Sequence, residues 1–417
     1  MEIEDINPWW RTEKLQEEYR DMKKRDLFGK IIPYLEEKQI IAINGLRRVG
    51  KTVLMHQLIK HLLEKKEKEK ILYYNFDLFE GNEKIESILK KYEKLIDVDM
   101  DNDEVFIFLD EVQKCNNWEN ELKLLYDNYP NLKFFISGSS SLFIEKKTKE
   151  SLAGRAFTFT LKPLKFKEYL SLKDVDIGEN IDLYRKKIKK HLSHYIRTGG
   201  FPELVNTKNN GKIDRYIKEL VIDRVAYIDI PKSFDIEEPE LLVRILSILA
   251  SRPGCEVNYQ NLAGDLERDR KTISNYVSYL ERAFLIKKLY TYSKNLLKSE
   301  RKKKKVYPAS TAISYLFEAK QGRIIENAIL MNSDIDFFKR ENREVDFIKI
   351  GKKTEKIIPI ESKYKEKVRR REIKGLINFM DKNGIRKGKV ITKNHKGKEK
   401  IRGKEIEFIP LWKWLLD

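Results

Sequence analysis

The sequence predicts an α/β fold built around a parallel sheet. Short apolar, β-branched runs alternate with segments of helical periodicity in the first part of the 417-residue chain. Adjacent runs are separated by enough residues for a crossover helix, which is typical of parallel strands. The predicted strands are residues 40–43, 71–76, 105–109 and 133–137.

The elements after the parallel sheet change in character twice. A mainly helical stretch begins beyond Pro163 and is interrupted by the turn at 198–202, and we interpret it as a helical lid. Three short helical patterns start at Leu241, and strands follow near 286–292 and 305–307. A second α/β pattern then has strands at 335–339, 345–350 and 357–362 and a helix near 373–380. We therefore expect four domains, at 1–162, 163–238, 239–310 and 311–417.

The basic residues are concentrated in the last third of the chain. Residues 1–290 carry 51 basic and 49 acidic side chains, whereas residues 291–417 carry 34 and 17, so that most of the net charge of +19 lies there. Clustered Lys and Arg favour a polyanionic partner such as DNA, because they release counterions from a phosphate backbone. A Lys-rich, merely soluble surface is the alternative.

Cysteine usage and hydropathy predict a cytoplasmic protein that does not enter a membrane. Only Cys115 and Cys255 occur, and they match neither a metal-ligand spacing nor a disulfide framework. The sequence shows no basic-then-apolar leader and no apolar run of transmembrane length.

A glycine-rich segment between the first strand and the first long helix predicts a nucleotide site. Its glycines let backbone N–H groups turn toward phosphates, its lysine neutralises the β and γ groups, and its threonine hydroxyl can bind Mg²⁺. The segment matches the Walker A pattern G-x-x-x-x-G-K-[ST] in full. Its residues are Gly45, Leu46, Arg47, Arg48, Val49, Gly50, Lys51 and Thr52. The fold class is thus a P-loop NTPase, with a nucleoside triphosphate and Mg²⁺ as its ligands.

Two later strand ends complete this predicted site. The apolar strand 105–109 ends in Asp110 and Glu111, of which Asp110 can serve the magnesium ion and Glu111 can orient or deprotonate the attacking water. The next strand ends in hydroxyls, so that Ser137 or Ser139 can contact the γ-phosphate or the water. A serine-rich turn without such a role is the alternative for either residue.

The chain resembles the archaeal and bacterial AAA+-type ATPases of the Orc/Cdc6-related and STAND-like group. GLRRVGKT, FIFLDEVQ, FFISGSSS, LAGR at 152–155, LKPLKFKEYL from Leu161 and GGFPE at 199–203 carry the resemblance. It implies ATP rather than GTP, and a winged helix after the lid. It also implies that Arg155 is an arginine finger or sensor, although a structural salt bridge is the alternative.

The three helical patterns from Leu241 predict a winged helix that contacts DNA. The third pattern has a polar face suited to a major groove, and the basic run between the two following strands suits a wing on the phosphates. A plain interaction module is the alternative. The expected DNA-contacting residues are Arg270, Lys271 and Ser274 of the helix and Lys302, Lys303, Lys304 and Lys305 of the wing.

The last predicted domain resembles the PD-(D/E)xK nuclease superfamily, and thus a restriction-endonuclease-like α/β fold. The resemblance rests on Glu326, Asp346 and the E-x-K strand end at Glu361 and Lys363, although the Pro of the motif is absent before Asp346. Two carboxylates would fix Mg²⁺ against a scissile phosphate, and the lysine would stabilise the developing charge. A surface ion pair of the same residues is the alternative.

These features predict an ATPase that acts as a nucleotide-dependent switch on DNA, and they leave open whether its nuclease site cleaves. The rival hypothesis is an ATP-dependent regulatory or scaffold protein that binds a protein partner and contains an inactive nuclease fold. The sequence also leaves homo-oligomer formation open.

Overall fold

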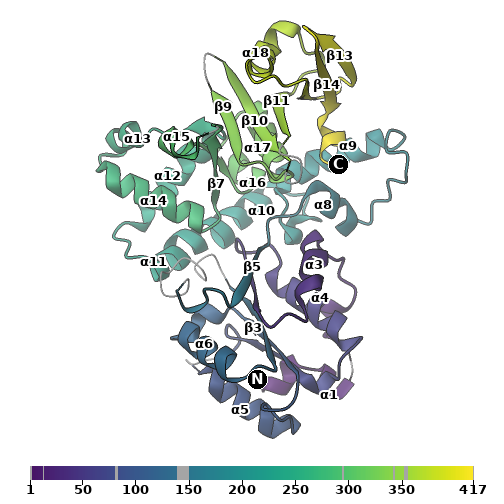
Figure 1. The fold of residues 1–417 in the computed structure, drawn as a ribbon, viewed down its shortest axis with the longest axis vertical. Helices are drawn as coiled ribbons and strands as arrows, with labels where there is room; N and C mark the ends of the chain where they lie inside the picture. The colour runs from purple at the N-terminus through teal and green to yellow at the C-terminus, as the bar shows by residue number, and fades with distance from the viewer. Residues whose placement is uncertain are drawn as a thin grey trace. The chain divides into compact units, whose positions relative to one another are not determined.

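The chain forms two units, and its path enters the first of them twice. A computed structural model describes residues 2–12, 14–79, 83–138, 150–293, 295–340, 343–351 and 356–416 (Figure 1). Unit 1 comprises Met1–Lys162 and Tyr227–Ile236, and unit 2 comprises Pro163–Ala226 and Glu237–Asp417. The division into four domains stays a prediction.

A five-stranded parallel sheet forms the centre of unit 1, in the order β2-β3-β4-β1-β5. The four predicted strands are confirmed. The fifth was not predicted, because its residues alternate Thr with Phe and are only partly buried. The strands are β1 (Ile40–Asn44), β2 (Ile71–Asn75), β3 (Val105–Asp110), β4 (Leu132–Ser137) and β5 (Ala156–Thr160).

Helices cover both faces of this sheet, as in a P-loop NTPase fold. Figure 1 shows α3 and α4 on one side and α5 and α6 on the other. The indoles of Trp9 and Trp10 both donate to the Ile71 carbonyl at 3.0 Å, which fastens the N-terminal segment to β2. The helices are α1 (Trp9–Thr12), α2 (Glu17–Arg20), α3 (Asp26–Ile31), α4 (Lys51–Leu63), α5 (Ile85–Ile96), α6 (Trp118–Asn128) and α11 (Ile230–Ser233).

Unit 2 contains a nine-stranded mixed sheet, in the order β13-β14-β12-β11-β10-β9-β7-β8-β6. Strand β11 runs antiparallel to β10 and parallel to β12, and β7 joins β9 in parallel, so that one sheet spans two of the predicted domains. The strands are β6 (Cys255–Glu256), β7 (Ile286–Thr291), β8 (Lys305–Pro308), β9 (Phe337–Arg340), β10 (Glu344–Ile350), β11 (Ile357–Lys363), β12 (Lys387–Thr392), β13 (Gly397–Ile401) and β14 (Lys404–Pro410).

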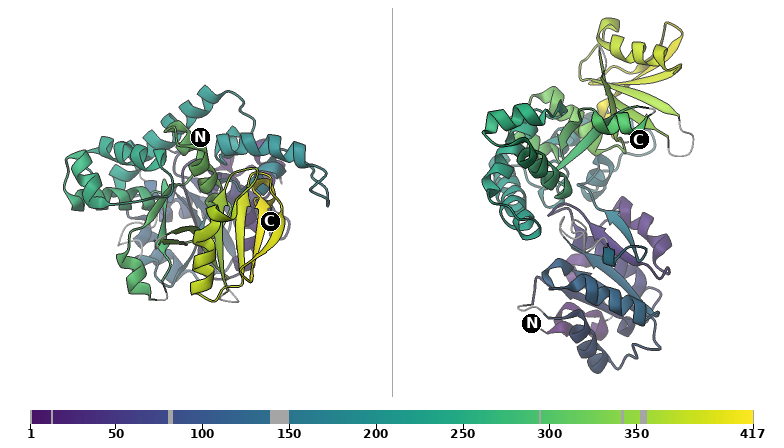
Figure 2. Two further views of the ribbon diagram at one scale, coloured as in Figure 1. Left: turned by 90° about the horizontal axis from the view of Figure 1, so that it is seen from above. Right: turned by 60° about the vertical axis from the view of Figure 1, so that its left-hand side comes forward.

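Two hydrophobic cores lie on opposite faces of the strands from β10 to β14. Because side chains alternate along a strand, Ile391 belongs to the core that contains α17, whereas Val390 belongs to the core that contains α18. The right-hand view of Figure 2 shows these strands in light green and yellow. Helices α8 (Phe166–Leu172) and α9 (Arg185–Thr198), which were predicted as a lid, contribute to the core with α17. The lid role stays a prediction.

The remaining helices of unit 2 follow the predicted order. The three helical patterns after Leu241 correspond to α12, α13 and α14, and the helix near 373–380 corresponds to α18. Among the described residues, none of the helices combines the length and the apolar character that a bilayer crossing needs. The helices are α10 (Asn210–Arg215), α12 (Pro239–Ser251), α13 (Tyr259–Leu266), α14 (Arg270–Arg282), α15 (Leu296–Arg301), α16 (Thr311–Leu316), α17 (Gln321–Met331), α18 (Lys374–Lys382) and α19 (Leu411–Trp414).

Candidate functional site

The Walker A residues form the turn between β1 and α4. A Cβ at Gly45 would lie 2.2 Å from the Leu161 carbonyl oxygen, and the φ of Gly45 is +148°. Gly50 has a φ of +94° immediately before α4 begins at Lys51. Both positions therefore need glycine, which lets the backbone approach β5 and turn into the helix. The arrangement directs the helix N-terminus at the loop, as anion binding requires.

Lys51 folds back over its own loop. Its Nζ donates to the carbonyls of Gly45 and Leu46, both at 3.2 Å, and the side chain is buried. Burial lowers the pKa of Lys51, and the carboxylates of Glu111 and Asp110 act in the opposite sense. A triphosphate would supply stronger acceptors than two neutral carbonyls, so that this ammonium is suited to bind it.

Asp110 is the fully buried carboxylate at the end of β3. It accepts hydrogen bonds from the Thr52 hydroxyl at 2.6 Å, from the Tyr73 hydroxyl at 3.0 Å and from the Ser137 hydroxyl. Three strands and α4 thus converge on one acid. Thr52 and Asp110 offer adjacent oxygen atoms, the ligands that Mg²⁺ prefers, and therefore fit the predicted ion. Ser139 lies outside the described residues.

Glu111 adopts a left-handed backbone conformation, with a φ of +53°. This conformation costs a non-glycine residue on the order of 1 kcal/mol and is found disproportionately at functional sites. The carboxylate accepts a hydrogen bond from the Gln113 side chain at 2.5 Å. It lies directly after Asp110, as the predicted role of orienting a water requires.

Two arginines of unit 1 are held by carboxylates of the same unit. Arg47 donates to both oxygens of Asp229, at 2.6 and 2.9 Å, and Asp229 is buried. The hydrogen bonds that Arg47 donates to Asp229 raise the pKa of Arg47. Arg155 donates to both oxygens of Asp127, at 2.9 and 2.8 Å, which is the salt-bridge alternative for this residue. Its predicted role as an arginine finger stays a prediction.

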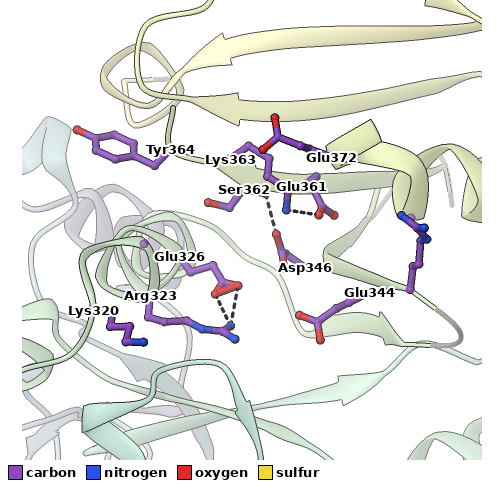
Figure 3. A pocket seen from close by; sticks show the side chains of 13 residues that line it. Lys320, Arg323, Glu326, Glu344, Asp346, Glu361, Ser362, Lys363, Tyr364 and Glu372 are labelled. Carbon is purple, nitrogen blue, oxygen red and sulfur yellow. Dashed lines mark hydrogen bonds and ion pairs between the residues drawn. The ribbon is translucent and has the colours of Figure 1, made fainter. Parts of the chain in front are cut away.

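The C-terminal candidates meet in a pocket of about 640 Å³ in unit 2. Figure 3 shows Glu326 from α17, Asp346 from β10 and Glu361 with Lys363 from β11 around it. Lys363 Nζ lies 2.5 Å from Glu361 Oε1, and Asp346 accepts a hydrogen bond from the Ser362 N–H at 2.8 Å. Residues far apart in sequence therefore share one site.

Burial and mutual repulsion shape the charges in this pocket. Burial, and then the charge of Asp346, raise the pKa values of Glu326 and Glu361 to about 8. Burial acts upward on Asp346 as well, but the ammonium groups of Lys305 and Lys363 outweigh it and lower the pKa of Asp346. Glu361 Oε2 is buried and has no hydrogen-bond partner among the residues that the structure describes. Closely spaced acids of this kind suit a divalent cation.

Lys305 corrects one prediction about the wing. Its side chain is 1% exposed and forms ion pairs with Glu326, Glu344 and Asp346, so it cannot contact a phosphate backbone. The expectation failed because Lys305 is the first residue of β8 and its side chain is buried in the protein interior. Lys302 and Lys303 are exposed, and Lys304 lies 3.4 Å from Glu300.

The predicted recognition helix is α14. Arg270 and Lys271 are exposed in its first turn, and Ser274 is partly exposed. Asp269 caps this helix by accepting from the N–H groups of Lys271 and Thr272. DNA contact by these residues stays a prediction.

Three family models match the chain. An AAA domain covers residues 37–170, and two domains of unknown function, DUF8612 and DUF4143, cover residues 189–319 and 321–414. The chain is 30% identical to the uncharacterized protein MJ1544 of Methanocaldococcus jannaschii, with 94% of this chain and 90% of that protein aligned. The chain is a member of the MJ1544 family and contains an AAA domain.

The chain is also similar to several proteins at lower sequence identity. An uncharacterized protein of Haemophilus influenzae is 25% identical to this chain, with 86% of this chain and 91% of that protein aligned. The Walker-type ATPase PABY2304 of Pyrococcus abyssi is 14% identical, with 71% of this chain and 96% of that chain covered and a TM-score of 0.42. Cdc6p of Pyrobaculum aerophilum has a TM-score of 0.31 at 11% identity, with 70% and 92% covered.

Sequence reasoning missed several residues of both candidate sites. Asp229 lies far along the chain from Arg47, and Tyr73 is an ordinary apolar position of a strand, so that neither gave a signal. Glu344 could have been predicted, because it precedes Asp346 by two residues and so lies on the same face of β10. Lys305 was identified as a cation, but its direction could not be read from a run of five basic residues.

Removal of Glu111 should separate ATP binding from hydrolysis. We expect Glu111→Gln to lower the ATPase rate at least about 100-fold, because the water loses its base, while ATP still binds. Lys51→Ala should weaken ATP binding itself at least about tenfold. Steady-state hydrolysis and calorimetry measure the two effects. Glu104→Gln, at a surface ion pair with Lys66, is the control and should change neither.

The Arg47–Asp229 pair should oppose nucleotide binding. Asp229 acts on Lys51 electrostatically, so that Asp229→Asn removes a negative charge near the phosphates and frees Arg47. We expect about fivefold tighter ATP binding. Arg47→Ala should weaken binding, since Asp229 then remains unpaired.

Opposite signs for the two variants are the decisive result, and calorimetric titration with ATP measures them. Equal losses would contradict the expectation. Asp214→Asn, which disrupts a surface pair with Arg197, is the control.

The raised pKa of Glu361 predicts a pH-dependent stability. The folded state keeps a proton that the unfolded state releases between its ordinary pKa and about 8, so that stability falls as the pH rises through this window. Glu361→Gln removes this loss. In metal-free buffer, we expect the Tm of the variant minus the Tm of the wild type to be at least about 3 °C larger at pH 9 than at pH 5.

Thermal unfolding at each pH measures this gain, and a Tm difference that does not change with pH would contradict it. Glu372→Gln is the matched control, because the ion pair with Lys365 lowers the pKa of Glu372. Its stability contribution is lost only in acid, so its Tm difference should stay flat over the same range.

Proposed function

We propose that this AAA-type ATPase is a nucleotide-dependent switch on DNA whose C-terminal region is a metal-dependent nuclease. One observation carries the proposal: Glu326, Asp346, Glu361 and Lys363 come from three elements and line one open pocket. Ion pairs formed by chance on a surface are exposed, whereas Asp346 and Glu361 are buried. Buried acids are costly unless a partner or a ligand compensates them.

The pocket has the donor set that divalent cations require. Glu326, Asp346 and Glu361 offer hard oxygen ligands, and within the described part of the chain one oxygen of Glu361 has no partner. A bound Mg²⁺ or Mn²⁺ would polarise a phosphate and supply a nucleophilic hydroxide near neutral pH. Lys363 is placed by the strand pleat on the same side as Glu361, where its charge can stabilise the phosphate as negative charge develops.

The order of elements around the pocket supports the nuclease-like fold. Helix α17 precedes the antiparallel strands β9, β10 and β11, and α18 then leads into β12, parallel to β11. The acids occupy α17, β10 and the end of β11, as the E-x-K resemblance implies.

A second pocket, of about 390 Å³, supports a path for a phosphate backbone. Lys339, Arg343 and Lys382 line it, and Arg343 and Gly375 also line the acidic pocket. Basic side chains would therefore hold a strand on its way to the carboxylates. The excess of basic over acidic residues in this part of the chain agrees with such a partner.

The path of the chain supports a role for the nucleotide as a switch. Residues 227–236 belong to unit 1, although the chain on both sides of them belongs to unit 2. Asp229 in this segment binds Arg47 of the phosphate loop. Phosphates that compete for Arg47 would change the state of a segment that continues directly into unit 2 in both directions. Binding or hydrolysis of ATP could use this link.

An ATP-dependent regulatory or scaffold protein is the second candidate. It is favoured by Lys305, which already neutralises part of the acidic cluster and would suit an inactive nuclease fold with a protein partner.

A cleavage assay decides between the two. Supercoiled and linear DNA are incubated with the full chain and Mn²⁺ or Mg²⁺, with and without ATP. We expect nicking that falls at least about 100-fold in Asp346→Ala, because the metal loses a buried ligand. Asp336→Ala is the matched control, because Asp336 is an exposed aspartate of the same unit and pairs with Lys287.

The nucleotide site is tested in the same assay. Lys51→Ala should retain metal-dependent nicking and lose its response to ATP. Salt-sensitive DNA binding without nicking by the wild type would leave a non-catalytic DNA switch. Loss of both binding and nicking would favour the scaffold alternative.

A further inference from the structure

Lys305 carries a positive charge from β8 into the acidic pocket. Its Nζ forms an ion pair with Glu344 and lies 3.8 Å from Asp346 Oδ1 and 4.0 Å from Glu326 Oε1. The side chain is 1% exposed. Its strand is paired on both sides, with Leu289 of β7 and with Glu256 of β6 opposite Lys305. The sheet therefore fixes the backbone position from which this ammonium reaches the three acids.

The three partners of Lys305, Glu326, Glu344 and Asp346, are also spaced as metal ligands are. One oxygen from each of Glu326, Glu344 and Asp346 lies within 4.8 Å of the other two. Figure 3 shows these three acids around a common space. A divalent cation would need those oxygens at about 2.0–2.6 Å, in the region that Lys305 now neutralises.

A second observation points to a ligand in this pocket. Glu361 is 5% exposed and lines the same cavity, and no described residue forms a hydrogen bond with its Oε2. Lys363 satisfies the other oxygen. A buried carboxylate oxygen without a donor is costly, so that a ligand is expected to satisfy it.

We propose that Lys305 is an internal competitor of the divalent cation, occupying its charge position among Glu326, Glu344 and Asp346 and weakening metal binding. The proposal rests on the proposed function only for the identity of the pocket as a metal site. Two cations that share three carboxylates repel each other in a buried environment, so the metal binds fully only when the ammonium leaves the cluster.

This role differs from that of Lys363. Lys363 forms its ion pair with Glu361 at the strand end, whereas Lys305 forms its ion pairs with the other three acids. A lysine that serves only the reaction would be needed for cleavage and would have no effect on metal affinity. A competitor has the opposite signature, because its removal must tighten metal binding.

The test is metal affinity in the full chain, stripped with EDTA and free of nucleotide. Mn²⁺ is titrated by calorimetry into wild type, Lys305→Met and Lys305→Arg. We expect Lys305→Met to bind Mn²⁺ at least about tenfold more tightly, since methionine keeps the length and removes the charge. Lys305→Arg should stay as weak as wild type. Lys304→Met is the matched control, because Lys304 pairs with Glu300 outside the cluster.

Adding Asp346→Asn to Lys305→Met assigns the signal to this pocket, since the gain should then disappear. Thermal unfolding covers the case in which Lys305→Met is unstable: Mn²⁺ should restore its Tm more than it raises that of wild type. Unchanged or weaker affinity in Lys305→Met overturns the proposal. So does a variant that stays unfolded in Mn²⁺, because a fitting metal would supply the missing charge.

The outcome is separable from that of the proposed function. Tighter Mn²⁺ binding by Lys305→Met together with a wild type that never nicks DNA supports the competitor and rejects the nuclease. Nicking by wild type with unchanged affinity in Lys305→Met does the reverse.

Discussion

The buried carboxylate of Asp110 is the contact on which the nucleotide site depends. It accepts hydrogen bonds from Thr52, Tyr73 and Ser137, and so joins the first turn of α4 to the middle of β2 and the end of β4. An acid without these donors would be expensive to bury at the centre of a sheet. The hydrogen bond from Thr52 also holds Thr52 and Asp110 side by side. The bonds that allow Asp110 to be buried therefore also produce the geometry that an ion needs.

Unit 2 solves a different electrostatic problem with paired charges. Its sheet is covered on both faces by apolar cores, and the acids at one edge of α17, β10 and β11 are compensated by Lys305 and Lys363. Lys305 precedes these acids in the sequence, and Lys363 follows them. Lys305 of β8 thus compensates acids of α17 and β10, and β8 lies in the same continuous sheet as β10 and β11.

The sequence was sufficient where a residue's role depends on local pattern. Continuous apolar runs located β1 to β4, and the glycine spacing located the phosphate loop, because both signals are contained in a few adjacent residues. Strand β5 escaped, since an edge strand with alternating Thr and Phe lacks such a run. The partners of Arg47 and Lys305 also escaped, because they depend on tertiary contacts across 182 and 39 positions. Whether α8 and α9 act as a lid likewise cannot be deduced from helical periodicity.

The double passage of the chain through unit 1 has a practical consequence for dissecting this protein. A fragment that stops at Lys162 would contain every Walker residue and would still lack the carboxylate that holds Arg47. Conversely, a fragment that starts at Pro163 would carry the ten residues from Tyr227 to Ile236 without the surface on which they fold. Neither fragment therefore reproduces the properties of the full chain. Measurements on either one will include the effect of separating the segment Tyr227–Ile236 from the rest of unit 1.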